Sequence, residues 1–253
     1  MARHLEGTVA LVTGASSGIG EATAVALAAE GATVAIAARR RDRLERVVER
    51  VGNDADVLVI ETDVTDEAAA RAMVEATVTE FGRLDTVVNN AGVMLLGPIV
   101  DAPVEEWRRM VQLNLLGLLY TTHAALPHLL DAAEREPRRV ADLVNVSSVA
   151  GRTARQGSGV YNATKFGVGA FSESLRQEVT RRHVRVSLVE PGAVRTELAG
   201  HNRPEVLEGL SAVIGQTEIM RAEDIAESIV FTVTRPRHVA VNEVLIRPTE
   251  QER

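Results

Sequence analysis

A regular alternation of short apolar runs with longer helical patterns is the feature that most constrains how this chain folds. The predicted strands are Thr8–Thr13, Ala32–Ala38, Ala55–Glu61, Leu84–Asn89, Val140–Ser147, Val184–Glu190 and Asn242–Arg247. The predicted helices between them are Gly18–Glu30, Arg41–Val51, Asp66–Phe81, Pro103–Ala133, Ser158–Arg182 and Ala222–Thr234. This alternation predicts an α/β fold: a doubly wound parallel sheet of about seven strands, with helices on both faces.

The chain offers no obvious point of division. It has 253 residues with no internal repeat or linker, and one α/β core commonly reaches this length, so we expect residues 1–253 to form a single domain. The stretch Gly192–Gln216 lacks strand character and is interrupted by Gly200, Pro204 and Gly209. Long irregular segments of a compact domain are often active-site lids, and we expect one at about residues 193–216.

Composition excludes several classes of protein. One Trp, two Tyr and four Phe leave a core of Val, Leu, Ile and Ala, which suits parallel strands buried on both faces. A net charge of −7 with dispersed basic residues argues against nucleic acid or an anionic membrane surface as a partner. The absence of cysteine excludes disulfides, thiolate metal sites and a Cys nucleophile. The six histidines lack metal-ligand spacing, so we expect no metal.

The amino-terminal residues contain no apolar signal region, and no apolar run approaches the roughly 18 residues that span a bilayer. We therefore expect a cytoplasmic protein.

A glycine-rich stretch follows the first predicted strand and opens the first predicted helix. It runs from Thr13 to Gly20 as TGASSGIG. Glycine lets a backbone approach a ligand without a Cβ in the way, and a helix start presents free N–H groups to an anion. The G-x-x-x-G-x-G spacing differs from the general dinucleotide fingerprint, so a turn that only permits packing is the alternative. The residues expected to hold a pyrophosphate are Gly14, Ser16, Ser17, Gly18, Ile19 and Gly20.

Two arginines follow the second predicted strand. NAD-specific folds carry an acid near this point for the ribose 2′-hydroxyl, whereas arginine accommodates a 2′-phosphate. Here Ala38 takes the place of the acid, and Arg39 and Arg40 follow it. Cations at a helix start oppose its dipole by about 0.3–1 kcal/mol, a local cost that indicates an anionic ligand. A solvated basic run is the alternative; the pattern favours NADP(H) over NAD(H).

Tyr161 and Lys165 lie four residues apart at the start of a predicted helix, so they share one face. A nearby ammonium favours the phenolate and is expected to lower the pKa of the tyrosine. Ser148 lies at the carboxyl end of a predicted strand, where ligands bind in open α/β sheets. An exposed helix pair and an ordinary serine turn are the alternatives for each motif taken alone.

Together these motifs resemble the short-chain dehydrogenase/reductase superfamily. Its signatures stand here at Thr13–Gly20, Asn89–Gly92, Asn114, Ser148, Tyr161-x-x-x-Lys165 and Pro191-Gly192. The likeness runs from about Gly7 to Arg247, and within the superfamily it is greatest to NADP-dependent 3-hydroxy-acid dehydrogenases and clavulanate (clavaldehyde) dehydrogenase. The resemblance implies a Rossmann-like fold.

The resemblance also implies a role for each signature residue. Tyr161 would be the acid–base, Lys165 would hold the nicotinamide ribose, Ser148 would orient the carbonyl oxygen, and Asn114 would hold a water that links Lys165 to solvent. The other implied cofactor contacts are Asp63, Val64, Asn90, Ala91, Gly92, Pro191, Gly192, Val194 and Thr196. The chain departs from the family pattern at Thr164, where serine is commoner. It also has no basic residue before Gly18, so a 2′-phosphate would rely on Arg39 and Arg40.

The implied function is hydride transfer between NADP(H) and a small carbonyl or alcohol, as in a carbonyl reductase. A catalytically inactive NADP-binding regulator, or a dehydratase or epimerase on the same fold, is the alternative. The two long predicted helices, Pro103–Ala133 and Ser158–Arg182, commonly pack between subunits in this family, which implies a homotetramer or homodimer.

The expected substrate pocket is lined by Met94, Leu95, Arg152, Thr153, Gln156 and the predicted lid. Its one cation, Arg152, is a candidate to attract a substrate carboxylate, and a solvated loop arginine is the alternative.

Overall fold

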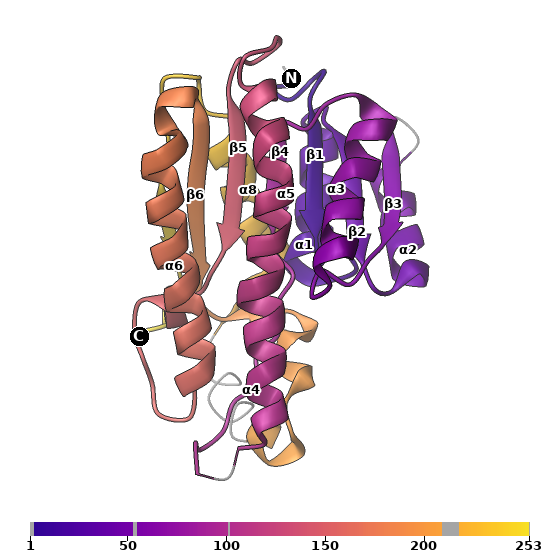
Figure 1. Cartoon of the computed structure of the whole chain (residues 1–253). Helices are drawn as coiled ribbons and strands as arrows, with labels where there is room; N and C mark the ends of the chain where they lie inside the picture. Colours follow the sequence, from indigo (N-terminus) through magenta and orange to yellow (C-terminus); the bar gives the residue numbers. More distant parts are fainter. Residues whose placement is uncertain (1–2, 53–54, 101, 209–217, 253) are drawn as a thin grey trace.

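A computed structural model describes residues 3–52, 55–100, 102–208 and 218–252 (Figure 1). The strands in these residues are β1 (Val9–Thr13), β2 (Thr33–Ala38), β3 (Val57–Glu61), β4 (Thr86–Asn89), β5 (Ala141–Val146), β6 (Val184–Pro191), β7 (Val194–Arg195), β8 (Met220–Arg221) and β9 (Glu243–Ile246). The helices are α1 (Gly18–Ala29), α2 (Arg41–Val51), α3 (Glu67–Phe81), α4 (Val104–Met110), α5 (Gly117–Ala132), α6 (Gly159–Val179) and α8 (Ala222–Val233). Shorter helical segments are η1 (Val111–Leu116), η2 (Val149–Gly151), η3 (Thr180–Arg182) and η4 (Glu197–His201).

Seven of the strands form one sheet in the order β3-β2-β1-β4-β5-β6-β9, and every neighbouring pair is parallel. The predicted doubly wound sheet is therefore confirmed, with each of these strands within two residues of its predicted bounds. Within the described ranges, no helix combines the length and apolar character that crossing a membrane requires.

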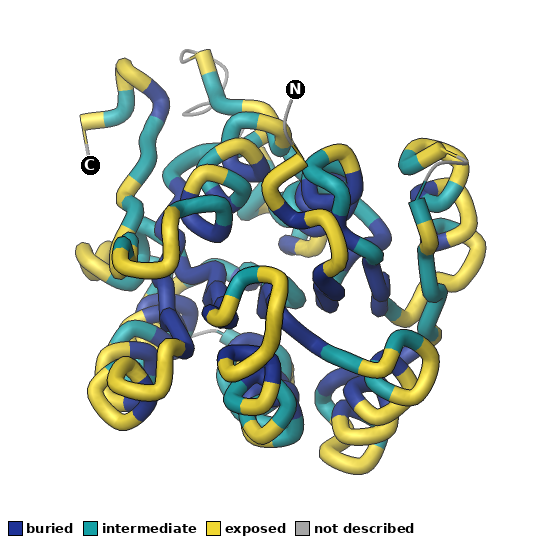
Figure 2. Tube along the Cα trace, turned by 90° about the horizontal axis from the view of Figure 1, so that it is seen from above, coloured by how far each residue is buried: buried dark blue, intermediate teal, exposed yellow. Residues whose placement is uncertain are grey.

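Helices cover both faces of the sheet. Successive strand residues point to opposite faces, so Leu11 packs in a cluster with Met73 of α3 and Leu129 of α5, whereas Val12 packs with Leu27 of α1 and Ile225 of α8. In Figure 1, α3, α5 and α6 lie on one side and α1, α2 and α8 on the other. Figure 2 shows the strands as a buried centre and the outer faces of the helices as exposed. This double burial accounts for the aliphatic composition.

The order of the strands reverses at β1, which lies between β2 and β4. At such a reversal the loops after the two adjacent strands leave a crevice outside the carboxyl ends of the strands. The glycine loop follows β1, and Asn90–Gly92 follows β4, so both predicted cofactor motifs flank this crevice. The strand arrowheads in Figure 1 point toward the end of the molecule where α4 lies.

Two features differ from the sequence prediction. The helical segment predicted over Pro103–Ala133 is confirmed as the contiguous α4, η1 and α5, but η1, which carries Asn114, has π-helical geometry. Within a long apolar helix a π turn is hard to recognise from the sequence, and such segments are frequent at functional sites. The short parallel pair of β7 and β8 is also not predicted by the sequence. Residues 209–216 of the predicted lid lie outside the described residues.

Candidate active site

The first turns of α6 bring Tyr161 and Lys165 into the protein interior. Their exposed fractions are only 6% and 7%. The Lys165 Nζ lies 5.9 Å from the centroid of the Tyr161 ring and donates a hydrogen bond of 2.9 Å to the carbonyl of Val146, the last residue of β5. A second tie to the same strand end is the hydrogen bond of 3.1 Å from the Ser147 hydroxyl to the carbonyl of Lys165. The tyrosine and the lysine are therefore fixed at the carboxyl ends of the strands.

Ser148 caps the segment η2, directly after β5. Its hydroxyl oxygen accepts a hydrogen bond of 3.1 Å from the Ala150 amide, and its side chain is hydrogen-bonded to that of Tyr161. The two hydroxyl groups therefore adjoin, and a carbonyl oxygen placed between them would receive two donors.

Burial controls the protonation of both α6 residues. It raises the pKa of Tyr161 above its ordinary value of 10.0, and the hydrogen bond with Ser148 offsets only part of that shift. It lowers the pKa of Lys165 from 10.5 to about 8, because an ammonium is poorly solvated there. The sequence prediction that Lys165 lowers the pKa of Tyr161 is thus wrong for this structure. Removing the phenol from water raises the pKa of Tyr161 by more than the hydrogen bond with Ser148 lowers it.

Asn114 joins the π segment η1 to the loop after β4. Its amide accepts a hydrogen bond of 2.8 Å from the Val93 amide and donates one of 2.8 Å to the Val93 carbonyl. A Cβ on Gly92 would lie 3.3 Å from the Asn114 Oδ1 and 3.9 Å from the Lys165 Nζ. Asn114, Gly92 and Lys165 therefore converge, although they are far apart in the sequence.

The glycine loop is packed so closely that side chains are excluded. Gly14 has φ +66°, and a Cβ there would lie 2.8 Å from the backbone of Ala91. A Cβ on Gly20 would lie 2.5 Å from the carbonyl oxygen of Gly14. Asn90 holds this arrangement by donating to the carbonyls of Thr13 and Gly14, at 3.0 and 3.3 Å. Such a bare backbone turn before a helix start fits a pyrophosphate.

Arg40 lies over the glycine loop. Its Nη2 donates to the hydroxyls of Ser16 and Ser17, at 3.1 Å each, and its Nη1 donates to Glu197 at 3.0 Å. Arg39 is the more exposed of the pair and lies 3.9 Å from Asp63 in an ion pair. Arg40 therefore lies against the glycine loop after β1, whereas Arg39 lies beside the turn after β3.

The remaining predicted contacts divide into two groups. Asp63 accepts hydrogen bonds from the amide and hydroxyl of Thr65, and Val64 is buried near Gly117, so both belong to the turn after β3. On the other side, Thr196 lies beside Gly18, where a Cβ would be 3.0 Å from its methyl group.

Pro191 ends β6, Gly192 follows it, and Val194 begins β7. The Gly192 amide donates to the Ile246 carbonyl, and the next amide, that of Ala193, donates to Gln251. The segment after β6 is thus held at the carboxyl end of the sheet, where Thr196 adjoins the glycine loop.

Comparison with known proteins agrees with this geometry. Residues 8–206 match the family described as short chain dehydrogenase. An uncharacterized oxidoreductase of Staphylococcus aureus strain N315 is 37% identical over 240 residues, which are 95% of this chain and 96% of that protein. The chain belongs to the short-chain dehydrogenase family.

Solved structures agree with that assignment. The closed form of a serine dehydrogenase complexed with NADP+ has a TM-score of 0.88 at 32% identity and covers 97% of both chains. A 3-ketoacyl-(acyl-carrier-protein) reductase from Brucella melitensis complexed with NADH has a TM-score of 0.84 at 29% identity, covering 96% of this chain and 97% of that one. This short-chain dehydrogenase is therefore an oxidoreductase with relatives that bind either cofactor.

Arg152 of this short-chain dehydrogenase is not a free cation. Its Nε lies 2.8 and 2.7 Å from the two carboxylate oxygens of Glu190, and its Nη2 also pairs with Glu243. The Glu190 side chain is only 1% exposed. The hypothesis that Arg152 attracts a substrate carboxylate is thereby weakened, because two protein carboxylates already occupy the guanidinium.

Several contributing residues escaped the sequence prediction. Glu190 is buried at the end of β6, and a charged residue closing an apolar strand was the signal available. Asn145, inside β5, donates to Ser172 of α6 and accepts from Asn89 of β4, which ties the helix of Tyr161 to the sheet. Glu197, which pairs with Arg40, had no signal, because its partner is distant in the sequence.

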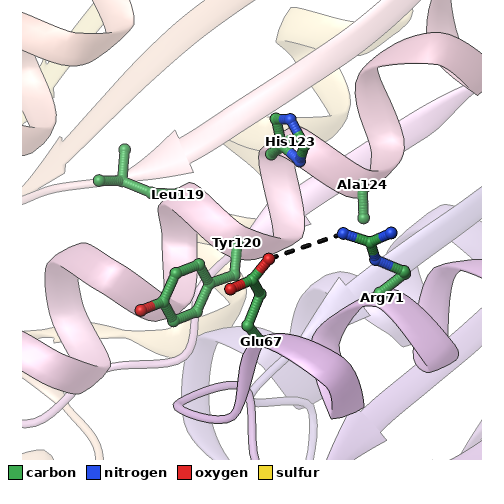
Figure 3. Close-up of a pocket in the computed structure, with 6 residues that line it drawn as sticks. All are labelled: Glu67, Arg71, Leu119, Tyr120, His123 and Ala124. Atoms are coloured by element: carbon green, nitrogen blue, oxygen red, sulfur yellow. Dashed lines mark ion pairs between the residues drawn. The ribbon is translucent and has the colours of Figure 1, made fainter.

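A hollow of about 280 Å³ lies away from these residues, between α3 and α5 (Figure 3). Glu67, Arg71, Tyr120 and His123 are among its lining residues, and Glu67 and Arg71 form an ion pair across part of it. None of the predicted site residues lines it, so this hollow is separate from the catalytic arrangement.

Proposed function

We propose that this short-chain dehydrogenase is an NADP(H)-dependent carbonyl reductase in which Tyr161 is the acid–base. The observation that carries the proposal is that Tyr161, Ser148 and Lys165 lie close together at the carboxyl ends of the strands, where the glycine loop also lies. Such a set joins a proton donor, a second hydroxyl and a dinucleotide cradle in one crevice.

The residues of the crevice fit a dinucleotide phosphate. Gly14, Gly18 and Gly20 permit a tight turn before the start of α1, whose free N–H groups would bind a pyrophosphate. Arg40 supplies a cation beside the hydroxyls of Ser16 and Ser17, and Arg39 supplies a neighbouring one, for a 2′-phosphate. The nicotinamide of the bound cofactor would supply or accept the hydride. The absence of an acid at Ala38 supports NADP(H) over NAD(H).

Side chains of the protein would carry out the proton transfer. Ser148 and the Tyr161 hydroxyl would both donate to the substrate oxygen, and Tyr161 would release its proton to that oxygen as the carbon is reduced. Lys165 would hold the cofactor ribose and balance the phenolate that remains. Burial favours the protonated form of Tyr161, the form that would donate a proton in carbonyl reduction.

Apolar contacts around Tyr161 support a small carbonyl substrate. Its ring belongs to a buried cluster with Val93, Leu95 and Met110, with Met94 packed against the cluster. Since the guanidinium of Arg152 is already paired, the pocket has no free cation there for a carboxylate. We therefore expect matched acid and methyl-ester substrates to be reduced with similar kcat/KM.

A panel of aldehydes, ketones and keto acids, each assayed with NADPH and with NADH, tests this proposal. We expect reduction of neutral carbonyls with a clear preference for NADPH. Cofactor binding without turnover on any member of the panel would favour an inactive regulator, and loss of water or epimerisation without net redox change would favour the other enzyme classes. Equal use of NADH would remove the proposed cofactor preference.

A further inference from the structure

A carboxylate already occupies part of the cation site that a 2′-phosphate needs. The Glu197 Oε2 lies 3.0 Å from the Arg40 Nη1, and its Oε1 accepts a hydrogen bond from the Arg43 Nη1. Arg43 lies in the first turn of α2, and Glu197 begins η4. This contact, here called the Glu197 bridge, spans the crevice from α2 to the segment after β6.

The bridge uses the guanidinium that also covers the glycine loop. Arg40 donates to Ser16 and Ser17 through Nη2 while its Nη1 is held by Glu197. A phosphate that joined the two serine hydroxyls would seek the same guanidinium, since arginine and phosphate pair through two parallel hydrogen bonds. Two anions at one guanidinium repel each other, so the carboxylate and the phosphate compete.

Arg43 completes the site from the other side. It points to the same carboxylate as Arg40, so whatever anion replaces Glu197 there meets both guanidinium groups. The pKa of Glu197 is lowered by Arg43 and Arg40, and the carboxylate is ionised at neutral pH. A phosphate monoester carries about −1.5 to −2 charge at neutral pH, more than a carboxylate. The phosphate is therefore the stronger partner for the two arginines.

We propose that Glu197 is an internal competitor for the 2′-phosphate of the cofactor and that Arg43 is a third phosphate-binding arginine. The inference rests on the proposed NADP(H) function. A cofactor with a 2′-phosphate displaces Glu197 from Arg40 and Arg43, whereas a cofactor with a 2′-hydroxyl leaves the Glu197 bridge intact. Glu197 then lowers the affinity of the protein for a 2′-phosphate cofactor.

Calorimetric titration with 2′,5′-ADP and with 5′-ADP tests this without any turnover. The proteins to compare are the wild type, Glu197→Gln, Arg43→Gln and Glu45→Gln. Glu45 is an exposed acid on α2 paired with Arg41, so Glu45→Gln removes the same charge nearby without touching the bridge. We expect Glu197→Gln to bind 2′,5′-ADP about 1.5-fold to fivefold more tightly, the range of an exposed ion pair, and 5′-ADP unchanged. Arg43→Gln should weaken only 2′,5′-ADP, and Glu45→Gln should match the wild type.

The outcomes distinguish failure of the Glu197 competition from failure of the proposed NADP(H) function. A wild type that binds 2′,5′-ADP no better than 5′-ADP contradicts the NADP(H) preference itself. A wild type that prefers 2′,5′-ADP, together with a Glu197→Gln variant that binds it equally or more weakly, overturns only the competition. In that case the Glu197 bridge would close over a bound cofactor instead of yielding to it.

Discussion

The chain has 28 Lys and Arg residues, and all of them except Lys165 are arginines. The difference matters at a buried position, because a lysine releases its proton when desolvated, whereas an arginine keeps its charge. Burial lowers the pKa of Lys165 to about 8. The one lysine of the chain is therefore at a position where its charge depends on its surroundings.

This uniqueness permits a direct titration. Protein labelled with ¹³C in its lysine should give a single side-chain signal, and we expect that signal to titrate near pH 8. The titration is followed by NMR, with Tyr161→Phe as a second sample to find the contribution of the phenol. A midpoint near the ordinary value of 10.5 would show that the ammonium is solvated and that the burial described above is not present in solution.

The same shift predicts a pH-dependent stability. Below pH 8 the folded and unfolded chains both hold the Lys165 proton, and folding carries the cost of burying the cation. Between about pH 8 and 10.5 the folded chain releases the proton first, so this cost disappears as the pH rises. Lys165→Met should therefore be more stable than the wild type by about 1–3 kcal/mol at pH 7, after the loss of the hydrogen bond to Val146. Chemical denaturation should show this advantage shrinking toward pH 10.

The pairing of Arg152 with Glu190 gives a further prediction at this scale. Burial already raises the pKa of Glu190, and Arg152 opposes that shift. Arg152→Ala leaves the carboxylate without its main partner and should lower the free energy of unfolding by about 1–3 kcal/mol at neutral pH. The double variant Arg152→Ala, Glu190→Gln should recover much of the lost free energy of unfolding. As a control, Arg176→Ala, which breaks an exposed pair with Glu173, should leave the denaturation midpoint unchanged.

At the scale of elements, the glycine loop shows what sequence could predict. Its glycines follow a strand and open a helix, so a tight backbone turn could be expected before the structure was known, as could the α6 pair Tyr161 and Lys165. The π geometry around Asn114 could not, since the residues of η1 are as apolar as those of the helix that follows it. Nor could the contacts of Glu197 with Arg40 or of Arg152 with Glu190, which join residues that only the fold brings together.

Gly14 and Gly82 have similar positive φ angles but different surroundings, so alanine substitutions at the two positions distinguish steric crowding from backbone strain. Gly14 has φ +66° with Ala91 backbone atoms 2.8 Å from a would-be Cβ, whereas Gly82 has φ +75° with nothing within 4 Å. Gly82→Ala should cost only about 1–2 kcal/mol for the left-handed backbone. Gly14→Ala should cost more and should also weaken dinucleotide binding, as measured by denaturation and calorimetry. Equal costs, with binding unaffected, would show that the loop is not packed as described.

At the scale of the whole molecule, exposed apolar side chains gather on packed elements. Val104 of α4, Val111 of η1 and Phe166 of α6 are 52%, 37% and 45% exposed. Large apolar groups at the surface of adjoining helices are typical of subunit contacts. They support the proposal, first drawn from the family resemblance, that this short-chain dehydrogenase assembles as a homodimer or homotetramer.

Sedimentation equilibrium of the wild type and of Phe166→Glu tests that assembly. We expect the wild type to sediment as a dimer or tetramer and Phe166→Glu as a smaller species, because a buried charge without a partner destabilises an interface. Arg46→Glu, on the exposed face of α2, changes a charge away from these helices and should sediment as the wild type does. A monomeric wild type would contradict the proposal.

The central claim is that Tyr161 delivers the proton when a carbonyl is reduced. Rapid-mixing measurement of NADPH oxidation in a single turnover, for the wild type and Tyr161→Phe, tests it most directly. General acids are typically worth about 10²–10⁴ in rate, so the account predicts a loss of that size with NADPH affinity within a few-fold of the wild type. A Tyr161→Phe enzyme that oxidised NADPH at more than half of the wild-type rate would contradict it.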